Sequence, residues 1–378
     1  MSFTILQKNL LELLEITCPV APTKSSLQVL SNIKISCTEK NIEITATDLD
    51  HSIRGSGSID GDSSFEIAVN ARKIYDIVKE IPQGNVVVEV DESVLSLQSE
   101  KGFLCKIAGT DVQDFPAFPE EKQTGQFDIS YAAFKDMAKK SSFAVSKDTS
   151  RSCLSGVLWE NSGKKSTMVA TDGHRLGATS ITVEQKSKEK IGGIITPKTL
   201  LHIDKILPSS ADKTMTVSFG EKYCTFTTEQ FSLCSKLIEG PYPDYEKVIP
   251  KNNPKKLMIE KALLSNAVRR VSVLSNQKTH LIKCVFSDKS LEIVVLNREI
   301  GAEARETIPV DYTGDTHTVG FNGMYLMEIL SIIDTATVRL EMNTQISACL
   351  LFPEYGKDAA NKSEDLFLIM PLRIMDEL

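Results

Sequence analysis

The sequence predicts an α+β protein made of three repeated domains, each with two helices packed on antiparallel sheets of about eight strands. The main observation is a repeat of 126 residues, which is one third of the 378-residue chain. In each copy, apolar residues at positions i, i+3 and i+7 form one face of a helix. These triplets are Ile74, Ile77 and Ile81; Leu200, Ile203 and Leu207; and Leu326, Ile329 and Ile333.

A second, earlier helix repeats in the same way. A short apolar strand leads into apolar helical positions over residues 3–14, and the pattern returns at 127–138 and 257–268. Short strands are expected before the later helix of each copy, and β-rich stretches with alternating apolar residues lie between the helices. The expected strands include 65–69, 193–196 and 318–321, with alternating stretches at 33–37 and 291–295.

Proline-rich stretches end the first two copies. Residues 114–119 read DFPAFP, and residues 242–250 read YPDYEKVIP. Prolines stiffen short linkers and stop strand pairing, so we place the domains at 1–120, 126–250 and 255–378. Three unrelated domains are the alternative, and they would make the matched spacings a coincidence.

The composition is that of an ordinary globular protein, with 41% hydrophobic residues, 25% charged residues and a mean hydropathy of −0.10. The net charge of −7 and the pI of about 5.5 argue against a uniformly basic nucleic-acid binder. A local basic surface on an acidic body remains compatible with these values.

The eight cysteines are scattered, and none forms a zinc-type pair. The N-terminus has no basic signal region, and no uncharged stretch is long enough to span a membrane. We therefore expect a reduced, cytoplasmic protein with no membrane contact, no metal and no cofactor.

The stretch VATDGHRL at 169–176 predicts a strand that runs into an Asp-Gly turn. One interpretation is a hairpin with a polar tip. The other is the rim of a peptide-binding groove, because His174 and Arg175 lie together beside apolar Leu176. Related segments contain Asp48, 124 residues before Asp172, and Asn297, 125 residues after it.

Common catalytic motifs are missing from the sequence, including the P-loop, GxSxG, HExxH and the EF-hand loop. Asp172 and His174 could act as an acid–base couple in a hydrolase, but their spacing on a tight turn is weak support. Loss of turnover in His174→Ala would favour that alternative.

Basic residues recur on the predicted helices. Lysine and arginine on helical surfaces suit sequence-independent contact with phosphates, although a solvated amphipathic face explains any single helix equally well. The basic positions are Arg72, Lys73, Lys79, Lys135, Lys139, Lys140, Lys147, Lys198, Lys205, Lys261, Arg269 and Arg270. Glu328 and Asp334 make the last helix an exception.

The C-terminal stretch 366–373 reads LFLIMPLR and is unusually apolar for the end of a chain. It is either a last strand of the third domain or part of a pocket. Pro371 is expected to interrupt strand pairing and to leave Met370 and Leu372 free to line that pocket.

Together, the three repeats, the basic helices and the motifs TDGHRL at 171–176, PDY at 243–245 and MPLR at 370–373 resemble the bacterial sliding clamp family, the beta subunit of DNA polymerase III. The resemblance covers essentially the whole chain. It implies the DNA-clamp fold and a head-to-tail homodimeric ring whose helices surround duplex DNA. It also implies a processivity factor without catalytic activity, which is loaded by a separate ATP-hydrolysing complex and tethers the polymerase, clamp-loader subunits and repair proteins through short peptides.

The resemblance also implies three sets of site residues. A partner-peptide pocket between the second and third domains would contain Leu154, Thr171, Gly173, His174, Arg175, Leu176, Pro243, Val248, Asn322, Tyr325, Ile346, Met370, Pro371, Leu372 and Arg373. Double-stranded DNA would contact Lys24, Arg72, Lys73, Arg151 and Lys198 without sequence preference. The dimer interface would join Cys105 and Ile107 to Val273 and Leu274 of the second copy.

The sequence departs from the family pattern at three places. Ser152 and Cys153 replace frequent aromatic residues, so stacking on DNA is not expected there, and Glu246-Lys247 replaces a commonly basic pair. The chain also continues through 374–378, an extension that either crowds the pocket or is solvated. A peptide-binding adaptor that forms no ring is a further alternative, and a purely monomeric chain in sedimentation would favour it.

Overall fold

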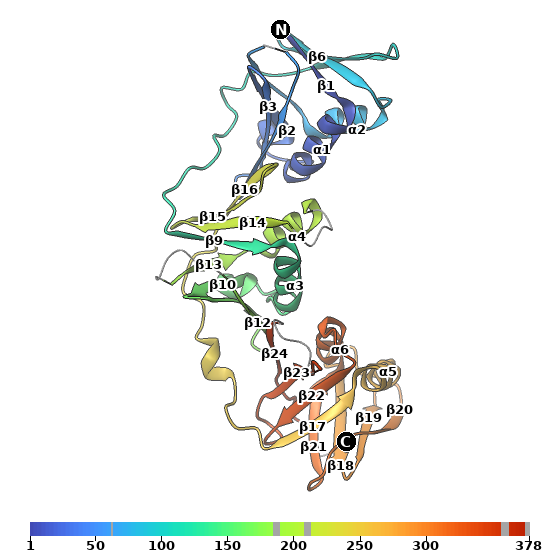
Figure 1. The fold of residues 1–378 in the computed structure, drawn as a ribbon. Helices are drawn as coiled ribbons and strands as arrows, with labels where there is room; N and C mark the ends of the chain where they lie inside the picture. Colours follow the sequence, from blue (N-terminus) through green and yellow to red (C-terminus); the bar gives the residue numbers. More distant parts are fainter. Residues whose placement is uncertain (62, 184–189, 208–212, 357–362, 375–378) are drawn as a thin grey trace. The chain divides into compact units, whose positions relative to one another are not determined.

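The structure is a computed structural model that describes residues 1–378 except 62, 184–189, 208–212, 357–362 and 375–378 (Figure 1). The chain forms two compact units. The first contains Met1–Ala132 and Glu184–Leu237, and the second contains Ala133–Val183 and Ile238–Leu378.

The predicted repeat is present as a strand followed at once by a helix, twice in each copy. The six pairs are β1 (Ser2–Leu6) with α1 (Gln7–Thr17), β5 (Phe65–Asn70) with α2 (Ala71–Glu80), β9 (Gly125–Ser130) with α3 (Tyr131–Ser142), β13 (Ile191–Ile195) with α4 (Pro197–Ile206), β17 (Lys255–Glu260) with α5 (Lys261–Ser272), and β21 (His317–Asn322) with α6 (Gly323–Ile332). The expected helical periodicity is therefore confirmed in all three copies.

Polar N-caps start the later helix of each copy. The side-chain oxygens of Asn70, Thr196 and Asn322, spaced 126 residues apart, accept hydrogen bonds from backbone amides in the first turns of α2, α4 and α6. The predicted apolar faces are buried in all three helices, with one difference. Ile77 is only half-buried, and Val78 beside it takes the fully buried position.

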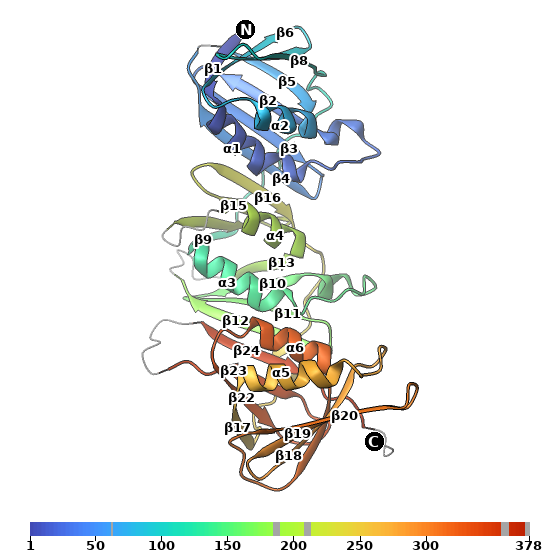
Figure 2. The same ribbon diagram turned by 90° about the vertical axis from the view of Figure 1, so that its right-hand side faces the viewer.

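The first unit contains two antiparallel sheets. One has the order β1-β6-β7-β8, with β6 (Asn85–Asp91), β7 (Val94–Ser99) and β8 (Leu104–Ala108). The other has the order β5-β2-β3-β4-β16-β15-β14-β9, with β2 (Asn32–Thr38), β3 (Asn41–Thr47), β4 (His51–Ser58), β14 (Thr214–Phe219), β15 (Tyr223–Thr227) and β16 (Phe231–Lys236). Helices α1 and α2 lie side by side and bury Leu14 and Val78 in this unit (Figure 2).

The second unit repeats this arrangement. Its larger sheet includes the order β10-β11-β12-β24-β23-β22-β17, with β10 (Val157–Ser162), β11 (Lys165–Thr171), β12 (Arg175–Thr182), β22 (Thr337–Met342), β23 (Cys349–Pro353) and β24 (Glu364–Ile369). Its smaller sheet has the order β20-β19-β18-β21, with β18 (Leu281–Ser287), β19 (Ser290–Asn297) and β20 (Ala302–Pro309). Helices α5 and α6 lie side by side, and Val268, Phe286 and Ile329 belong to the core beneath them (Figure 2).

The large sheets join strands from neighbouring copies of the repeat. In the first unit, β4 of the first copy pairs with β16 of the second, and His51 is opposite Ser235. In the second unit, β12 of the second copy pairs with β24 of the third, and Arg175 is opposite Ile369. Each of these sheets is therefore continuous across a predicted linker.

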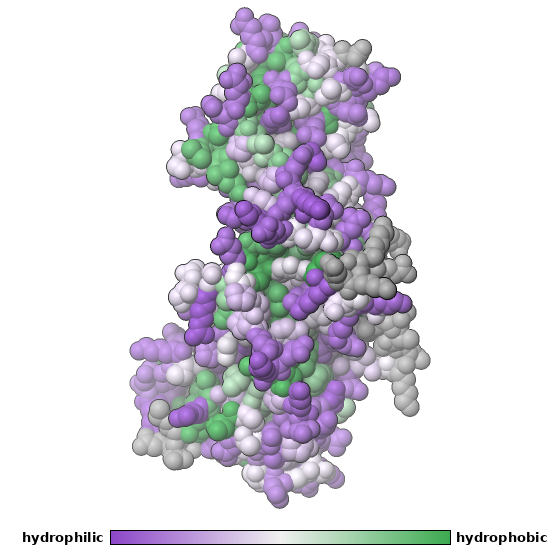
Figure 3. Space-filling model, turned by 90° about the vertical axis from the view of Figure 1, so that its left-hand side faces the viewer, coloured by the Kyte–Doolittle hydropathy of each residue, from purple (hydrophilic) through white to green (hydrophobic). Residues whose placement is uncertain are grey.

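Hydrophilic residues cover much of the face drawn in Figure 3, with smaller hydrophobic areas between them. None of the helices in the described ranges has both the length and the apolar character needed to cross a membrane.

Candidate functional site

The predicted turn lies between β11 and β12 in the second unit. Gly173 has φ = 89°, a left-handed conformation that favours glycine. Thr171 Oγ1 accepts the Gly173 amide at 3.0 Å and donates to the Arg175 carbonyl at 2.7 Å. The Asp172 Oδ1 accepts the amides of His174 and Arg175 at 2.9 and 3.0 Å. These side-chain bonds supplement the backbone bond from the Asp172 amide to the Arg175 carbonyl and fix the shape of the tip.

Arg175 turns inward from this tip, and its side chain is only 6% exposed. Its Nε lies 3.1 Å from Asp172 Oδ2, and its guanidinium also forms an ion pair with Glu328 of α6. The guanidinium carbon lies 4.4 Å from the ring centroid of Tyr325 and 5.5 Å from that of Phe143. Arg175 therefore fastens α6 to the turn through charge and stacking, and a ligand would meet the rings around it rather than a free cation.

The C-terminal segment that follows β24 lies against the turn and against β21. The Met370 amide donates to the His174 carbonyl at 2.8 Å, and the Leu372 amide donates to Gly320, also at 2.8 Å. The exposed His174 ring stacks near Tyr325, with 6.4 Å between centroids. As predicted, β24 stops at Ile369, before Pro371. The backbone amides of Met370 and Leu372, on both sides of that proline, nevertheless donate hydrogen bonds. The side chains of both residues are half-buried.

Beside the turn, one face of the large sheet carries an apolar cluster separate from the main core. Its buried members are Val169, Leu176, Ala348, Leu350 and Leu368, and its half-buried neighbours include Tyr245, Ile249 and Met370. We call this cluster the apolar floor. It places Leu176 and Met370, two of the predicted pocket residues, on one surface.

The other predicted pocket residues divide into two groups. Val248 ends the 3-10 helix Tyr245–Val248, whose first residue packs on the floor, and Pro243 follows Tyr242, whose hydroxyl accepts the Thr171 amide at 3.0 Å. Asn322 Oδ1 accepts the Tyr325 amide at 3.2 Å and so lies at the same end of α6. The interactions that join the turn, α6 and the chain end do not include Leu154, Ile346 or Arg373: Leu154 is buried, and the other two are exposed.

Phe143, Tyr242 and Glu328 belong to this site, although the sequence did not predict a site role for any of them. Glu328 follows Tyr325 by three positions on α6, and this helical spacing was a usable signal that both face the turn. Phe143 and Tyr242 gave no such signal, because they meet the turn only through long-range folding. Of the C-terminal extension, Ile374 is half-buried and 375–378 lie outside the described residues.

A second copy of the turn occurs in the first unit at residues 47–51. Thr47 Oγ1 accepts the Leu49 amide at 3.0 Å and donates to the His51 carbonyl at 2.9 Å. Asp48 Oδ1 accepts the His51 amide at 2.7 Å. Leu49 has φ = 75° where the other copy has Gly173, a strained conformation for a side chain of this size.

The floor beside this second turn is polar. By strand register, Thr45, Ser52, Thr225 and Cys234 stand where the other copy has Val169, Leu176, Leu350 and Leu368. The two turns therefore share a backbone design, and at these four positions the residues beside the turn of the second unit are more apolar than those of the first.

A buried polar cluster connects the first-unit turn to α4. His51 Nδ1 lies 3.1 Å from Asp48 Oδ1, and His51 Nε2 lies 3.1 Å from Thr199 Oγ1. Burial acts to raise the pKa of Asp48, but hydrogen bonds from His51 and Lys198 hold it well below its usual range. Burial, followed by the nearby charges of His51 and Lys198, lowers the pKa of His202 to about 4.

The five predicted DNA-contact residues are exposed, and they differ in their ion pairs. Arg72 pairs with Asp76 at 2.9 Å, and Lys198 pairs with Asp48. Among the other basic residues on predicted helices, Lys147 was wrongly placed on a helix, because α3 ends at Ser142, and Lys140 was wrongly placed on a surface. Its side chain is 3% exposed and lies 2.7 Å from both Asp136 and Asp365.

Two of the predicted interface residues lie on an edge strand of a small sheet, and the other two lie directly after α5. β8 is an edge strand that contains half-buried Cys105 and buried Ile107, with Leu104 57% exposed beside them. Val273 follows α5 and is 79% exposed, and Leu274 packs against the core of the second unit. The edge strand β20 belongs to that same unit.

The threefold strand–helix repeat, and the turn beside an apolar floor, define the class of DNA clamps. Models of the DNA polymerase III beta subunit match its N-terminal domain at residues 1–119, its central domain at 128–244 and its C-terminal domain at 246–371. The chain belongs to this family, the bacterial beta sliding clamps.

Known proteins of this family resemble the chain over its full length. The beta sliding clamp of Pseudomonas aeruginosa is 30% identical over 376 residues, which cover 99% of this chain and 100% of that protein. The beta sliding clamp of Escherichia coli K12 is 27% identical with the same coverage. A crystal structure of the P. aeruginosa subunit, and one of that clamp bound to griselimycin, each match with a TM-score of 0.92, 30% identity and coverage of 99% and 100%.

Proposed function

We propose that two copies of this chain form a head-to-tail ring around duplex DNA and tether a polymerase by its peptides. The observation that carries the ring is that β8 ends a sheet in the first unit and β20 ends one in the second. Edge strands expose unpaired backbone groups, and two complementary edges on one protomer allow a second copy to close a ring. In this proposal Cys105 and Ile107 meet Val273 and Leu274 of the second copy.

Contact with DNA in this proposal is electrostatic and carries no base recognition. The exposed Lys24, Arg72, Lys73, Arg151 and Lys198 would contact phosphates, which are the same in every sequence. The net charge of −7 disfavours tight adhesion to DNA outside such basic surfaces. Weak phosphate contact inside a closed ring permits sliding.

Partner peptides would bind beside the Thr171–Arg175 turn. The apolar floor supports this proposal, because a leucine or phenylalanine anchor gains about 1.5–3 kcal/mol on full burial. His174 and Tyr325 would form one wall, and Met370 and Leu372 another. The griselimycin complex of the P. aeruginosa clamp supports a ligand site on this type of protein. The other residues in the proposed pocket keep the assignments given from the sequence.

We further propose that the chain catalyses no reaction and works in the cytoplasm as three domains at 1–120, 126–250 and 255–378. The Asp172 carboxylate supports a structural role for the turn, because it already accepts two backbone amides and faces Arg175. These bonds argue against Asp172 as the base of an Asp172–His174 hydrolase.

The decisive experiment is retention on DNA. The protein is loaded onto nicked circular duplex DNA by a matching clamp loader with ATP, and bound protein is measured by gel filtration before and after the circle is cut. Enclosure predicts retention on the circle and rapid release from the linear product. Equal retention on both forms would show binding by direct contact and would reject the ring.

A further inference from the structure

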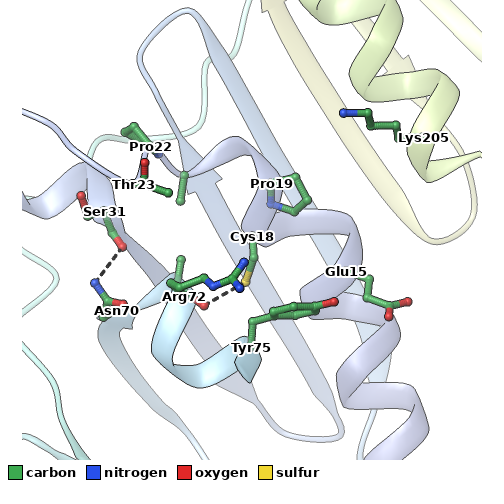
Figure 4. A pocket seen from close by; sticks show the side chains of 12 residues that line it. Glu15, Cys18, Pro19, Pro22, Thr23, Ser31, Asn70, Arg72, Tyr75 and Lys205 are labelled. Carbon is green, nitrogen blue, oxygen red and sulfur yellow. Dashed lines mark hydrogen bonds between the residues drawn. The ribbon is translucent and has the colours of Figure 1, made fainter. Parts of the chain in front are cut away.

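The first unit contains a cavity of about 630 Å³ between the segment that follows α1 and the first turn of α2 (Figure 4). Cys18, Pro19 and Pro22 form one side, and Arg72 and Tyr75 of α2 form the other. Cavities of this volume hold small organic ligands, including single nucleotides.

Two hydrogen bonds hold the walls together. The Cys18 thiol donates to the Ala71 carbonyl at 3.4 Å, and Asn70 Nδ2 donates to the Ser31 carbonyl at 3.5 Å (Figure 4). Burial raises the pKa of Cys18 to about 12, so the thiol is neutral and adds no negative charge. The cavity is therefore preformed on this side and does not repel an anion through its sulfur.

The cationic groups come from two helices. Arg72 lies in the first turn of α2, and Lys205 lies in the last turn of α4 and lines the same cavity. The Arg72 side chain is 71% exposed, and its described ion pair with Asp76 uses Nε. Exposed Lys24 and Lys73 adjoin the cavity residues Thr23 and Arg72 in sequence. A phosphate that enters the cavity would therefore meet a guanidinium on one side and an ammonium group on the other.

An aromatic ring lies next to these cations. The Arg72 guanidinium carbon is 5.9 Å from the centroid of Tyr75, whose ring lines the cavity. Glu15 lies on the Tyr75 side in Figure 4, where its carboxylate disfavours a phosphate. A ligand with a flat ring at one end and a phosphate at the other fits this polarity, and bases stack well on such rings.

We propose that this cavity holds one unpaired nucleotide of a DNA strand, with its base against Tyr75 and its phosphate at Arg72, while Lys205 adds positive charge on the far side of the cavity. The inference rests on the proposed DNA function and adds single-stranded DNA at a site that shares Arg72 with the proposed duplex contacts. A base inside a duplex is stacked and paired, so it cannot enter. A free nucleotide has the same chemistry and is the alternative source.

The test uses the full chain and fluorescence anisotropy with a labelled decathymidylate, a blunt duplex of the same length, and unlabelled thymidine monophosphate as competitor. Variants Tyr75→Ala, Tyr75→Phe, Arg72→Gln and Lys205→Gln change the cavity. Lys79→Gln is the matched control, because it removes the same charge from α2 outside the cavity. Unfolding midpoints establish that each variant is folded.

We expect Tyr75→Ala to weaken decathymidylate binding about 5- to 100-fold and Tyr75→Phe to keep it within about twofold. Arg72→Gln and Lys205→Gln should weaken it more than Lys79→Gln, and duplex binding should not depend on Tyr75. The proposal is overturned if Tyr75→Ala leaves strand binding unchanged or weakens duplex binding equally. If thymidine monophosphate binds as tightly as decathymidylate, the ligand is a free nucleotide and the proposed DNA strand is rejected.

Retention on nicked circular duplex DNA distinguishes a failure of the nucleotide site from a failure of the ring. Tyr75→Ala should be retained on circular duplex like the unaltered chain. Retention with an unchanged strand affinity would reject only the nucleotide site, whereas failure of the unaltered chain to be retained would reject the ring itself.

Discussion

His51 and Arg175 occupy the same place in two copies of one turn, and each side chain contacts the later helix of the following copy. His51 Nε2 lies 3.1 Å from Thr199 of α4, and Arg175 forms an ion pair with Glu328 of α6. Both follow an aspartate by three positions, and both backbone amides donate to that carboxylate. Both copies of the turn therefore contact the helix of the following copy, but one does so through a histidine and the other through an arginine.

Arg175→Ala should destabilise the second unit by about 2–3 kcal/mol, because Asp172 and Glu328 lose a shared partner. The value is below that of a fully buried pair, since the Glu328 side chain is 44% exposed. Differential scanning calorimetry should show an unfolding midpoint lowered by roughly 5–10 °C. Arg269→Ala removes an exposed arginine of α5 and should change the midpoint little. Equal shifts in both variants would argue against the inward role of Arg175.

Met370→Ala should weaken binding of a peptide with leucine and phenylalanine anchors by roughly 5- to 30-fold, because it removes part of the apolar surface. Isothermal titration calorimetry measures the affinity, and sedimentation should give an unchanged mass. Leu201→Ala, which shortens a 58%-exposed leucine of the first unit, is the control. Unaltered affinity in Met370→Ala would place the peptide elsewhere.

Leu104→Ser should raise the dissociation constant of the dimer roughly tenfold or more, because this edge-strand leucine would be buried only in the ring. The combination of Ile107→Ala with Leu274→Ala should act in the same direction. Analytical ultracentrifugation across a dilution series measures the effect. Leu201→Ser is closely matched, with 58% exposure against 57% for Leu104, and should leave the dimer intact. A dimer that persists unchanged in the Leu104 variant contradicts the interface.

Acid should weaken the first unit through His202. Its pKa falls from 6.5 to about 4 on folding, so the unfolded chain binds the proton more readily between those values. The free energy of unfolding is therefore unaffected by His202 above pH 6.5, and it decreases as the pH falls from 6.5 towards 4. Unfolding midpoints measured across this range should decline, and His202→Gln should make the decline shallower. The same slope in both proteins would assign the acid sensitivity to other groups.

Local periodicity was enough to predict the helices and their preceding strands. Leu264, Ala267 and Val268 are buried in α5 as their spacing requires, and the three second helices recur as the 126-residue repeat predicts. The Asp-Gly turn also followed from sequence, because the positive φ of Gly173 is a local property.

Contacts between residues far apart in the chain could not be predicted from local sequence patterns. Lys140 has the helical position of a surface lysine, but Asp365 lies beside it only after β12 and β24 pair. Arg175 likewise has the sequence context of an exposed tip, and its burial depends on Tyr325 and Glu328. The burial of a charged side chain depends on its distant partner, and that partner is not encoded in neighbouring residues.

The sheets that continue across the linkers make the central copy unsuitable for production as an isolated fragment. Cutting the chain at the proline-rich stretches would strip β16 of its pairing with β4 and β12 of its pairing with β24. Both strands would then present bare backbone to solvent and invite aggregation. The proline-rich stretches between sequence repeats are therefore not boundaries between independently folding units. Shortened versions for crystallisation or spectroscopy should keep both strands of each of these pairs.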